Sequence, residues 1–297
     1  MSGDGLVVVD KPAGMTSHDV VARIRRLART RKVGHGGTLD PMATGVLVVA
    51  VGRATRLLTY VIGAQKSYAA TIRLGQSTVT DDAEGEVVAA VPAGHLRDDE
   101  IRAALAGFLG DIDQVPSAVS AIKVDGQRAY RRARAGEEVV LPARRVTVFR
   151  IEALAVRRPE PALVDVDVEV TCSSGTYVRA IARDLGARLG VGGHLTALRR
   201  TAVGALTLAE AVTLPQLAQR APDVVGLPLP AAARRFLPTR DVGAAEAAAL
   251  SHGGLLDAMG ADGPYAVFGP DGTLVAVVRE RSGRARPEVV FALANRS

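Results

Sequence analysis

The sequence has few of the residues that build disulfide scaffolds and zinc sites. Its 297 residues include one cysteine, Cys172, and five histidines that are scattered along the chain. A single cysteine cannot form an internal disulfide, and the histidines lack the spacing of zinc ligands. The sequence therefore excludes a disulfide scaffold and a structural zinc, and we expect no bound metal.

Long apolar runs and a signal-like N-terminus are also missing. No uninterrupted apolar stretch approaches the ~20 residues that a membrane-spanning helix needs. Residues 1–12 carry an acidic side chain and a short apolar run, where a signal peptide would have a basic start and a longer apolar stretch. We therefore expect a cytoplasmic protein without membrane segments.

Aromatic residues are scarce, whereas positive charge is abundant. Aromatics make up 3% of the chain and tryptophan is absent. Lys+Arg number 37 against 31 Asp+Glu, which gives a net charge of +6, and most of the basic residues are arginine. Arginine suits phosphate contacts and stacks on bases, although a GC-rich genome produces the same bias. The charge fits a polyanionic partner without identifying it.

The apolar pattern predicts strands in irregular alternation with helices. Residues 5–10 and 45–52 are short continuous apolar runs, which are typical of strands covered on both faces. Residues 66–74 and 162–172 alternate apolar and polar side chains, as strands with one buried face do. Helical spacing predicts helices over 17–27, 98–109 and 178–189. The order favours an α+β class with a mixed, mainly antiparallel sheet flanked by helices.

A cluster of prolines predicts a domain boundary. Four of the 15 prolines fall within residues 221–240. We therefore expect a large domain over residues 1–225 and a small β-rich domain over residues 226–297. The small domain is predicted to contain an alanine-rich helix and three short strands, over 242–250, 265–268, 273–279 and 288–293.

Residues 115–140 form the longest stretch without a sustained hydrophobic period. The segment is rich in glycine and arginine. This composition predicts a long, mobile, basic loop inside the large domain.

The densest candidate for chemistry is the segment Gly34–Gly45, GHGGTLDPMATG. Its glycines and proline impose an unusual backbone that presents His35 and Asp40 just before a buried strand. The spacing matches neither a P-loop nor a dinucleotide fingerprint, which disfavours nucleotide hydrolysis. A turn in which Asp40 only caps backbone amides fits the same residues equally well.

Three other residues are open to two interpretations when considered alone. Tyr68 faces inward on its predicted strand, where a tyrosine is usually part of the core. Arg179 follows a glycine turn and Lys11 precedes Pro12, so each is either a surface cation or a side chain that reaches into a cleft.

Six motifs between residues 5 and 215 carry more information together than singly. In order they are VDKPAGMTS (9–17), GHGGTLDPMATG (34–45), KSY (66–68), RLGQST (73–78), SSGTYVR (173–179) and LRR (198–200). This series resembles the TruB family, the bacterial tRNA pseudouridine synthases that modify uridine-55 in the T loop.

The resemblance implies an isomerase that needs no metal or nucleotide cofactor. Such an enzyme breaks the N-glycosidic bond of the target uridine, turns the uracil and rejoins it to the ribose through carbon 5. Asp40 matches the catalytic aspartate, Arg179 the arginine that pairs with it and keeps it charged, and Tyr68 the tyrosine that stacks on the target base. Because a phenol has a pKa of ~10, Tyr68 is a poor base unless its surroundings shift that value.

The resemblance also implies a set of substrate-binding residues. His35 would fill the space left by the flipped nucleotide, Tyr177 and Leu198 would line the uracil pocket, and Asp82 corresponds to an acidic residue near the site. Lys11 would support the catalytic loop. The basic segment 115–140 corresponds to an insertion that closes over the T loop, with phosphate contacts from Arg128, Arg131, Arg132 and Arg134.

The implied partner is the T arm of tRNA, and we expect a monomer that requires no protein partner. The small C-terminal domain resembles a PUA or PUA-like RNA-binding domain in its position and short strands alone. A tRNA-folding chaperone or RNA-binding protein would share the basic loop and the small domain, but would give no reason for Asp40, Tyr68 and Arg179. A synthase that acts on another RNA, such as ribosomal RNA under a guide, would carry long basic tails, which are absent.

Overall fold

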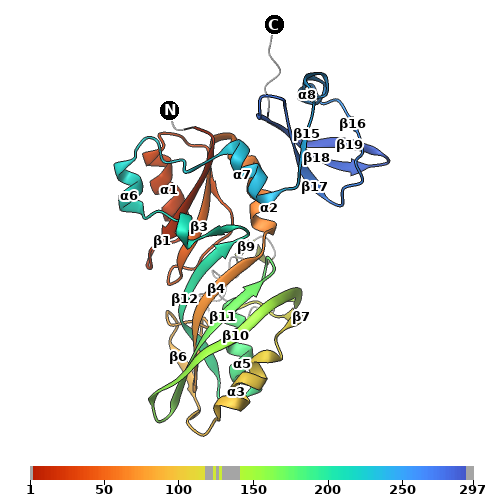
Figure 1. The fold of residues 1–297 in the computed structure, drawn as a ribbon. Helices are drawn as coiled ribbons and strands as arrows, with labels where there is room; N and C mark the ends of the chain where they lie inside the picture. Colours follow the sequence, from red (N-terminus) through yellow and green to blue (C-terminus); the bar gives the residue numbers. More distant parts are fainter. Residues whose placement is uncertain (1–2, 118–122, 125–126, 129–140, 292–297) are drawn as a thin grey trace.

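The computed structural model describes residues 3–117, 123–124, 127–128 and 141–291 of the chain. Two sheets, one of ten strands and one of five, organise this part of the protein (Figure 1). Helices lie beside both sheets, so the class is α+β as the sequence predicts. None of the helices in the described ranges is long and apolar enough to cross a membrane.

The ten-stranded sheet collects segments from most of the chain. Its strands are β1 (Gly5–Lys11), β2 (Val33–His35), β3 (Thr44–Val51), β4 (Lys66–Leu74), β7 (Gly110–Gln114), β10 (Arg144–Glu160), β11 (Leu163–Cys172), β12 (Gly193–Val203), β13 (Leu206–Thr207) and β14 (Leu227–Pro228). The main path runs β14-β1-β3-β12-β4-β11-β10-β7. Only β3 and β12 pair in parallel, with Arg200 opposite Gly45. The sheet is therefore mixed and mainly antiparallel, as predicted.

Helices and short hairpins flank this sheet. They are α1 (Ser17–Leu27), η1 (Gly52–Leu57), α2 (Leu58–Gly63), β5 (Gln76–Thr78) with β6 (Val87–Ala90), α3 (Asp98–Ala106), α5 (Val178–Arg188), η2 (Leu208–Glu210), α6 (Leu214–Gln219) and α7 (Leu229–Phe236). Helix α5 packs on β12, and α3 packs on β10 and α5. Helix α3 ends at Ala106, three residues before the predicted end at Leu109, and Gly107 is its C-cap residue.

Local sequence explains where α1 begins and which face it buries. Thr16 accepts a hydrogen bond from the Asp19 backbone, and the Asp19 side chain accepts one from the Thr16 backbone. This capping box starts the helix at Ser17. Val20, Val21 and Ile24 lie on its buried face, as their spacing predicts.

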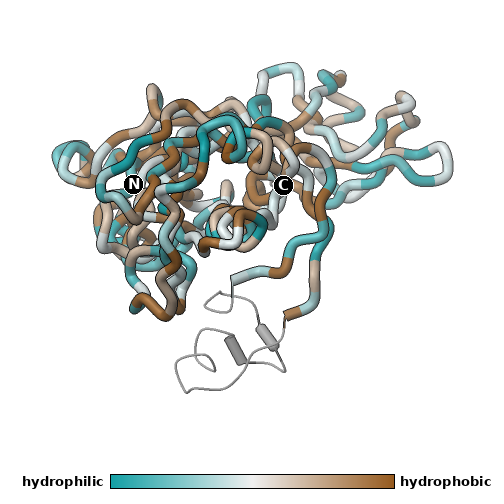
Figure 2. The backbone as a smooth tube through the Cα atoms, turned by 90° about the horizontal axis from the view of Figure 1, so that it is seen from below, coloured by the Kyte–Doolittle hydropathy of each residue, from teal (hydrophilic) through white to brown (hydrophobic). Residues whose placement is uncertain are grey.

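Strand β4 lies at the centre of the sheet, between β11 and β12. Its residues alternate between buried and half-buried along its whole length, as the sequence predicts. Tyr68 pairs with Val170 on one side and with Arg200 on the other. Figure 2 shows apolar (brown) and hydrophilic (teal) residues alternating along the same segments of backbone, as expected of elements with one buried face.

The five-stranded sheet contains only the C-terminal part of the chain. It consists of β15 (Thr239–Asp241), β16 (Leu256–Asp257), β17 (Pro264–Phe268), β18 (Leu274–Arg281) and β19 (Arg284–Val290), with α8 (Ala244–Ser251) beside it. Strand β19 begins at Arg284, four residues before the predicted start at Glu288. A turn at Ser282 and Gly283, both with positive φ, joins it directly to β18. The β-rich character of this part is as predicted.

Residues just beyond the expected boundary at 226 stay with the first sheet. Strand β14 pairs with β1, with Leu227 opposite Leu6, and α7 packs on β1 and η1. The second sheet begins only at Thr239. Phe268 and Phe291 join Leu6 in one hydrophobic cluster, so the two sheets share part of their core.

Of the predicted loop 115–140, the structure describes residues 115–117 and two paired two-residue strands, β8 (Lys123–Val124) and β9 (Gln127–Arg128). Arg128 lies in β9. Arg131, Arg132 and Arg134 lie outside the described residues.

Candidate active site

A cavity of about 260 Å³ opens beside Asp40. Its walls come from four parts of the chain that the first sheet brings together. They are the segment Gly37–Asp40 with Ile62, the strand β4 with Lys66 and Tyr68, the turn 174–179 at the start of α5, and Leu198 and Arg200 of β12. The cavity therefore contains all three predicted catalytic residues, Asp40, Tyr68 and Arg179.

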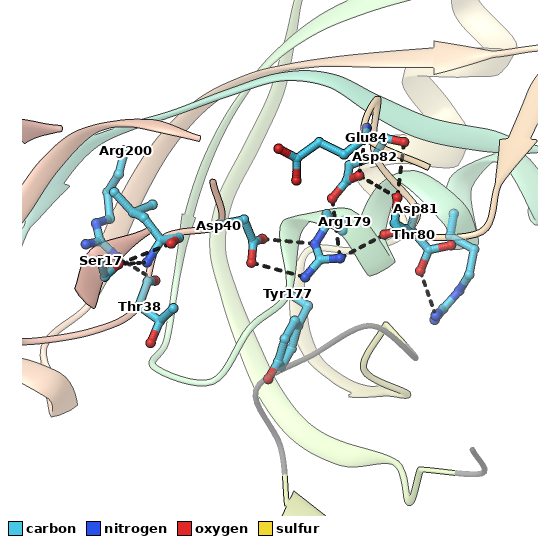
Figure 3. A network of polar contacts seen from close by, with 12 residues as sticks. Ser17, Thr38, Asp40, Thr80, Asp81, Asp82, Glu84, Tyr177, Arg179 and Arg200 are labelled. Carbon is cyan, nitrogen blue, oxygen red and sulfur yellow. Dashed lines mark hydrogen bonds and ion pairs between the residues drawn. The ribbon is translucent and has the colours of Figure 1, made fainter. Parts of the chain in front are cut away.

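Asp40 and Arg179 form a two-pronged ion pair at this cavity. Arg179 Nε lies 3.0 Å from Asp40 Oδ2, and Arg179 Nη2 donates to Asp40 Oδ1 at 3.2 Å (Figure 3). The planar guanidinium matches the two carboxylate oxygens, so the pair fixes the orientation of the carboxylate as well as its position. The sequence separates these residues by 139 positions, and only the fold makes them neighbours.

Arg179 is in turn held from its other side. Its Nη1 donates to the Thr80 carbonyl oxygen at 2.8 Å and lies 3.4 Å from Asp82 Oδ2. Asp82 is fixed by hydrogen bonds from Thr80 Oγ1 and the Glu84 backbone. Asp82 does not line the cavity, but it contacts the arginine that orients Asp40 (Figure 3).

Burial dominates the electrostatics of Asp40. It raises the pKa of the Asp40 carboxyl above the ordinary value of 3.8, and the charge of Asp82 raises it further. Arg179 and Lys11 oppose this shift, and the pKa remains above the ordinary value. The resemblance implies that Arg179 keeps Asp40 charged. In the structure, Arg179 offsets only part of the rise in the Asp40 pKa that burial causes.

Five hydrogen bonds from buried side chains hold the segment on which Asp40 lies. Ser17 Oγ donates to the Leu39 carbonyl and accepts from the Leu39 backbone N–H, at 3.1 and 2.8 Å. Lys11 Nζ donates to the Pro41 carbonyl at 3.1 Å. Arg200 donates to the carbonyls of Gly37 and Thr38 at 3.2 and 3.3 Å. The backbone on both sides of Asp40 is thus bonded to side chains from three separate elements.

Lys11 acts on this segment and does not line the cavity. Its side chain is fully buried, and burial lowers the pKa of its ammonium group to about 8. Lys11 thus contacts the segment that the resemblance expects it to support, and its role there stays a prediction.

Gly45 is required where the segment enters β3. Its φ is +96°, and a Cβ at this position would lie 2.2 Å from the Arg200 carbonyl oxygen. A side chain here would separate β3 from β12 and displace Arg200.

Tyr68 forms the wall of the cavity on β4. Burial raises the pKa of its phenol, and the charge and hydrogen bond of Arg200 oppose that shift only in part. The phenol therefore remains protonated at neutral pH, which favours contact through the ring over proton abstraction.

The other predicted residues fall into two groups. Tyr177 and Leu198 line the cavity. His35 does not line it; it lies on β2, half-buried, with its ring 5.3 Å from the ring of His18 in an edge-on arrangement. Burial and the charges of His18 and Arg200 lower the pKa of His35, which favours the neutral imidazole.

Several residues of the site were given no role from the sequence. Ser17, Lys66 and Arg200 lie inside the quoted motifs, so the motifs pointed to them. Lys66 lines the cavity and donates to the carbonyls of Ile62 and Ala64, both at 2.7 Å. Gln114, which binds Tyr177, carries no sequence signal that we recognised. Within the described ranges, no group of three or more His, Cys, Asp or Glu side chains is placed to hold a metal ion.

Two solved structures have a similar fold over almost the whole chain. One is an H/ACA ribonucleoprotein bound to a substrate RNA containing 2'-deoxyuridine, with a TM-score of 0.73 and 26% identity over 98% of this chain and 86% of the other. The second is an archaeal box H/ACA Nop10–Cbf5 complex, with a TM-score of 0.72 and 29% identity over 98% of this chain and 87% of the other.

Sequence comparison gives closer relatives. Proteins named tRNA pseudouridine synthase B from Arthrobacter sp. (strain FB24) and Thermobifida fusca (strain YX) are each 58% identical to this chain. The first match covers 98% of this chain and 97% of the relative, and the second covers 97% and 99%. Fold and site together define a pseudouridine synthase, an isomerase.

Three family models match the chain in succession. The model described as the N-terminal domain of TruB family pseudouridylate synthase matches residues 25–178. The tRNA pseudouridylate synthase B C-terminal domain matches residues 179–223, and the C-terminal model of tRNA pseudouridine synthase II matches residues 237–292. The chain belongs to the TruB family of pseudouridylate synthases.

Proposed function

We propose that this protein converts uridine-55 in the T loop of tRNA into pseudouridine. The observation that carries the proposal is the Asp40 carboxylate, held in two-pronged contact by the buried Arg179 at a cavity whose wall includes Tyr68. The tRNA substrate is supported by the relatives of 54–58% identity that are named tRNA pseudouridine synthase B.

In this mechanism the target uridine is flipped out of the RNA and enters the cavity. Flipping costs a few kcal/mol, and stacking of the uracil on Tyr68 offsets part of that cost. Tyr177 and Leu198 enclose the base from the sides. To His35, which lies outside the cavity beside α1, we assign the contact with the RNA at the space that the nucleotide leaves.

The ionised Asp40 carboxylate starts the isomerisation. It acts by attack on the ribose, by attack on the uracil ring, or by assisting a glycal intermediate, and all three routes need the charged form. The bond from carbon 1' to nitrogen 1 breaks, the uracil turns, and a bond from carbon 1' to carbon 5 forms. Carbon 5 loses one proton and nitrogen 1 gains one. The product therefore contains the same atoms as the uridine.

The remaining parts of the chain are assigned to RNA binding. We place phosphate contacts at Arg128, Arg131 and Arg132, and further contacts on the PUA-like C-terminal domain. The enzyme acts as a monomer in the cytoplasm, with the T arm of tRNA as its only required partner.

Mapping of pseudouridine in a tRNA transcript tests the proposal. Chemical derivatisation followed by reverse transcription should give one enzyme-dependent stop, at position 55. Asp40→Asn should abolish the stop and the release of tritium from carbon-5-labelled RNA, while the RNA still binds. Asp99→Asn is the matched control, because the Asp99 side chain is 72% exposed on α3, away from the cavity, and this variant should retain full activity. Conversion by Asp40→Asn, or modification at other uridines alone, would refute the proposal.

A further inference from the structure

Gln114 is a buried polar side chain that the mechanism above does not use. It is the last residue of β7 and is 2% exposed. Its Oε1 accepts a hydrogen bond from the Tyr177 backbone N–H at 2.8 Å, and its Nε2 donates to the Tyr177 carbonyl at 3.1 Å. One carboxamide thus pairs with both backbone groups of one residue, as a neighbouring strand would.

Tyr177, the residue that Gln114 binds, lies both at the start of α5 and at the wall of the cavity. Tyr177 is the N-cap residue of α5, and no side chain of its own caps the helix. Tyr177 also lines the cavity, and Arg179 follows two residues later on the same helix (Figure 3). The backbone of Tyr177 therefore sets where its ring lies against the base.

A hydrogen bond at the next residue, Val115, helps to fix the position of Gln114. Arg183, one turn after Arg179 on α5, donates from Nη2 to the Val115 carbonyl at 2.8 Å. Arg183 also lies 3.4 Å from Asp81, the neighbour of Asp82. The end of β7 is thus attached to α5 at two successive residues.

We propose that Gln114 is a positioning residue of the isomerase, which fixes the backbone of Tyr177 so that its ring meets the flipped uracil. The inference rests on the proposed function. Loss of the carboxamide would remove one hydrogen-bond partner from each backbone group of Tyr177, although the carbonyl also accepts from the Ile181 N–H at 3.2 Å. The start of α5 would therefore be held less tightly. A displacement of about 1 Å in a reacting assembly costs up to ~100-fold in rate.

Three variants separate positioning from general stability. Gln114→Leu keeps the approximate volume but neither hydrogen bond, and Gln114→Glu keeps the acceptor but loses the donor to the Tyr177 carbonyl. Gln216→Leu is the matched control, because Gln216 also accepts from backbone at a helix N-terminus, that of α6, and does not line the cavity.

The measurements are the single-turnover rate of pseudouridine formation at saturating enzyme, the Kd for T-arm RNA and the Tm. Both Gln114 variants should lower the rate by about 10-fold to 100-fold, with the Kd changed by less than about threefold. Gln216→Leu should leave the rate unchanged whatever it does to the Tm. A folded Gln114→Leu or Gln114→Glu with the wild-type rate would overturn the inference.

A double-mutant cycle tests whether Gln114 acts through Tyr177. If it does, Gln114→Leu should cost much less in a Tyr177→Ala background than in the wild type. An undiminished loss in that background would overturn the inference, because the effect would then bypass the Tyr177 ring. If Gln114→Leu does not fold, the cycle is run with Gln114→Glu. Wild-type protein that fails to modify the RNA at all would instead refute the proposed function.

Discussion

The segment around Asp40 and the C-terminal sheet use charged residues in opposite ways. The cations that hold or contact the Asp40 segment are buried, with Lys11, Arg200 and Arg179 at 0%, 1% and 4% exposure. In the C-terminal sheet, the pairs Arg284–Asp257 and Arg279–Glu288 lie at the surface. Burying a charge carries a large desolvation cost, which only well-made hydrogen bonds offset. The buried cations therefore lie where the positions of the Asp40 carboxylate and its backbone are fixed. The exposed ion pairs of the C-terminal sheet fix no such position.

The largest effect is expected at Arg179. Arg179→Lys retains one positive charge but cannot contact both Asp40 oxygens, so the carboxylate loses its fixed orientation. We expect the single-turnover rate to fall by about 100-fold to 1000-fold. Arg188→Lys, at the other end of α5, where Arg188 donates to the Ala104 carbonyl, is the control and should lose far less. Equal losses in the two variants would mean that the Asp40 pair has no special role.

Next in size is a loss of stability at Arg200. Arg200→Met removes the donor to the buried carbonyl of Val46 and to the part-buried carbonyls of Gly37 and Thr38. We expect the free energy of unfolding in urea to fall by about 3 kcal/mol. Arg199→Met is the neighbouring control, since Arg199 pairs with Asp10 near the surface, and it should cost about 1 kcal/mol or less. Similar losses at both positions would remove the distinction between buried and exposed cations.

An acid limb in the activity profile is expected from Asp40. Because the pKa of Asp40 is raised and the ionised form is needed, activity should fall as the pH drops through this raised value, by about tenfold per pH unit below it. The folded state holds this proton more tightly than the unfolded state does, so protonation of Asp40 does not itself unfold the protein. The circular dichroism spectrum should therefore be unchanged across the limb.

Asp82→Asn sharpens this test. Asp82 raises the pKa of Asp40, so its neutralisation should move the acid limb to lower pH, besides lowering the maximal rate. A limb that stays in place would show that another group controls it. Rates measured from mildly acidic to neutral pH on T-arm RNA provide the check.

The smallest effect is expected at the surface of the C-terminal sheet. Arg284→Ala removes the ion pair between Arg284 and Asp257. The two side chains are 49% and 85% exposed, respectively. Exposed pairs contribute less than about 1 kcal/mol, so the urea midpoint should hardly change. A loss as large as that of Arg200→Met would contradict the comparison between the two regions.

The sequence by itself determined the local elements and most of the chemistry. Alternation in residues 66–74 and 162–172 predicted β4 and β11, because a strand with one buried face imposes a period of two. The motifs containing Asp40, Tyr68 and Arg179 pointed to three residues that the fold brings to one cavity. Periodicity and motifs are properties of neighbouring residues, so they are readable along the chain.

The tertiary structure alone decided what joins distant segments. The position of residues 227–236 beside β1, the exclusion of His35 from the cavity and the hydrogen bonds of Gln114 had no counterpart in the sequence pattern. Arg200 meets Gly37 across 163 positions, and Gln114 meets Tyr177 across 63. Such contacts depend on the order and register of strands in the sheet, and a period reports only which face of a strand is buried.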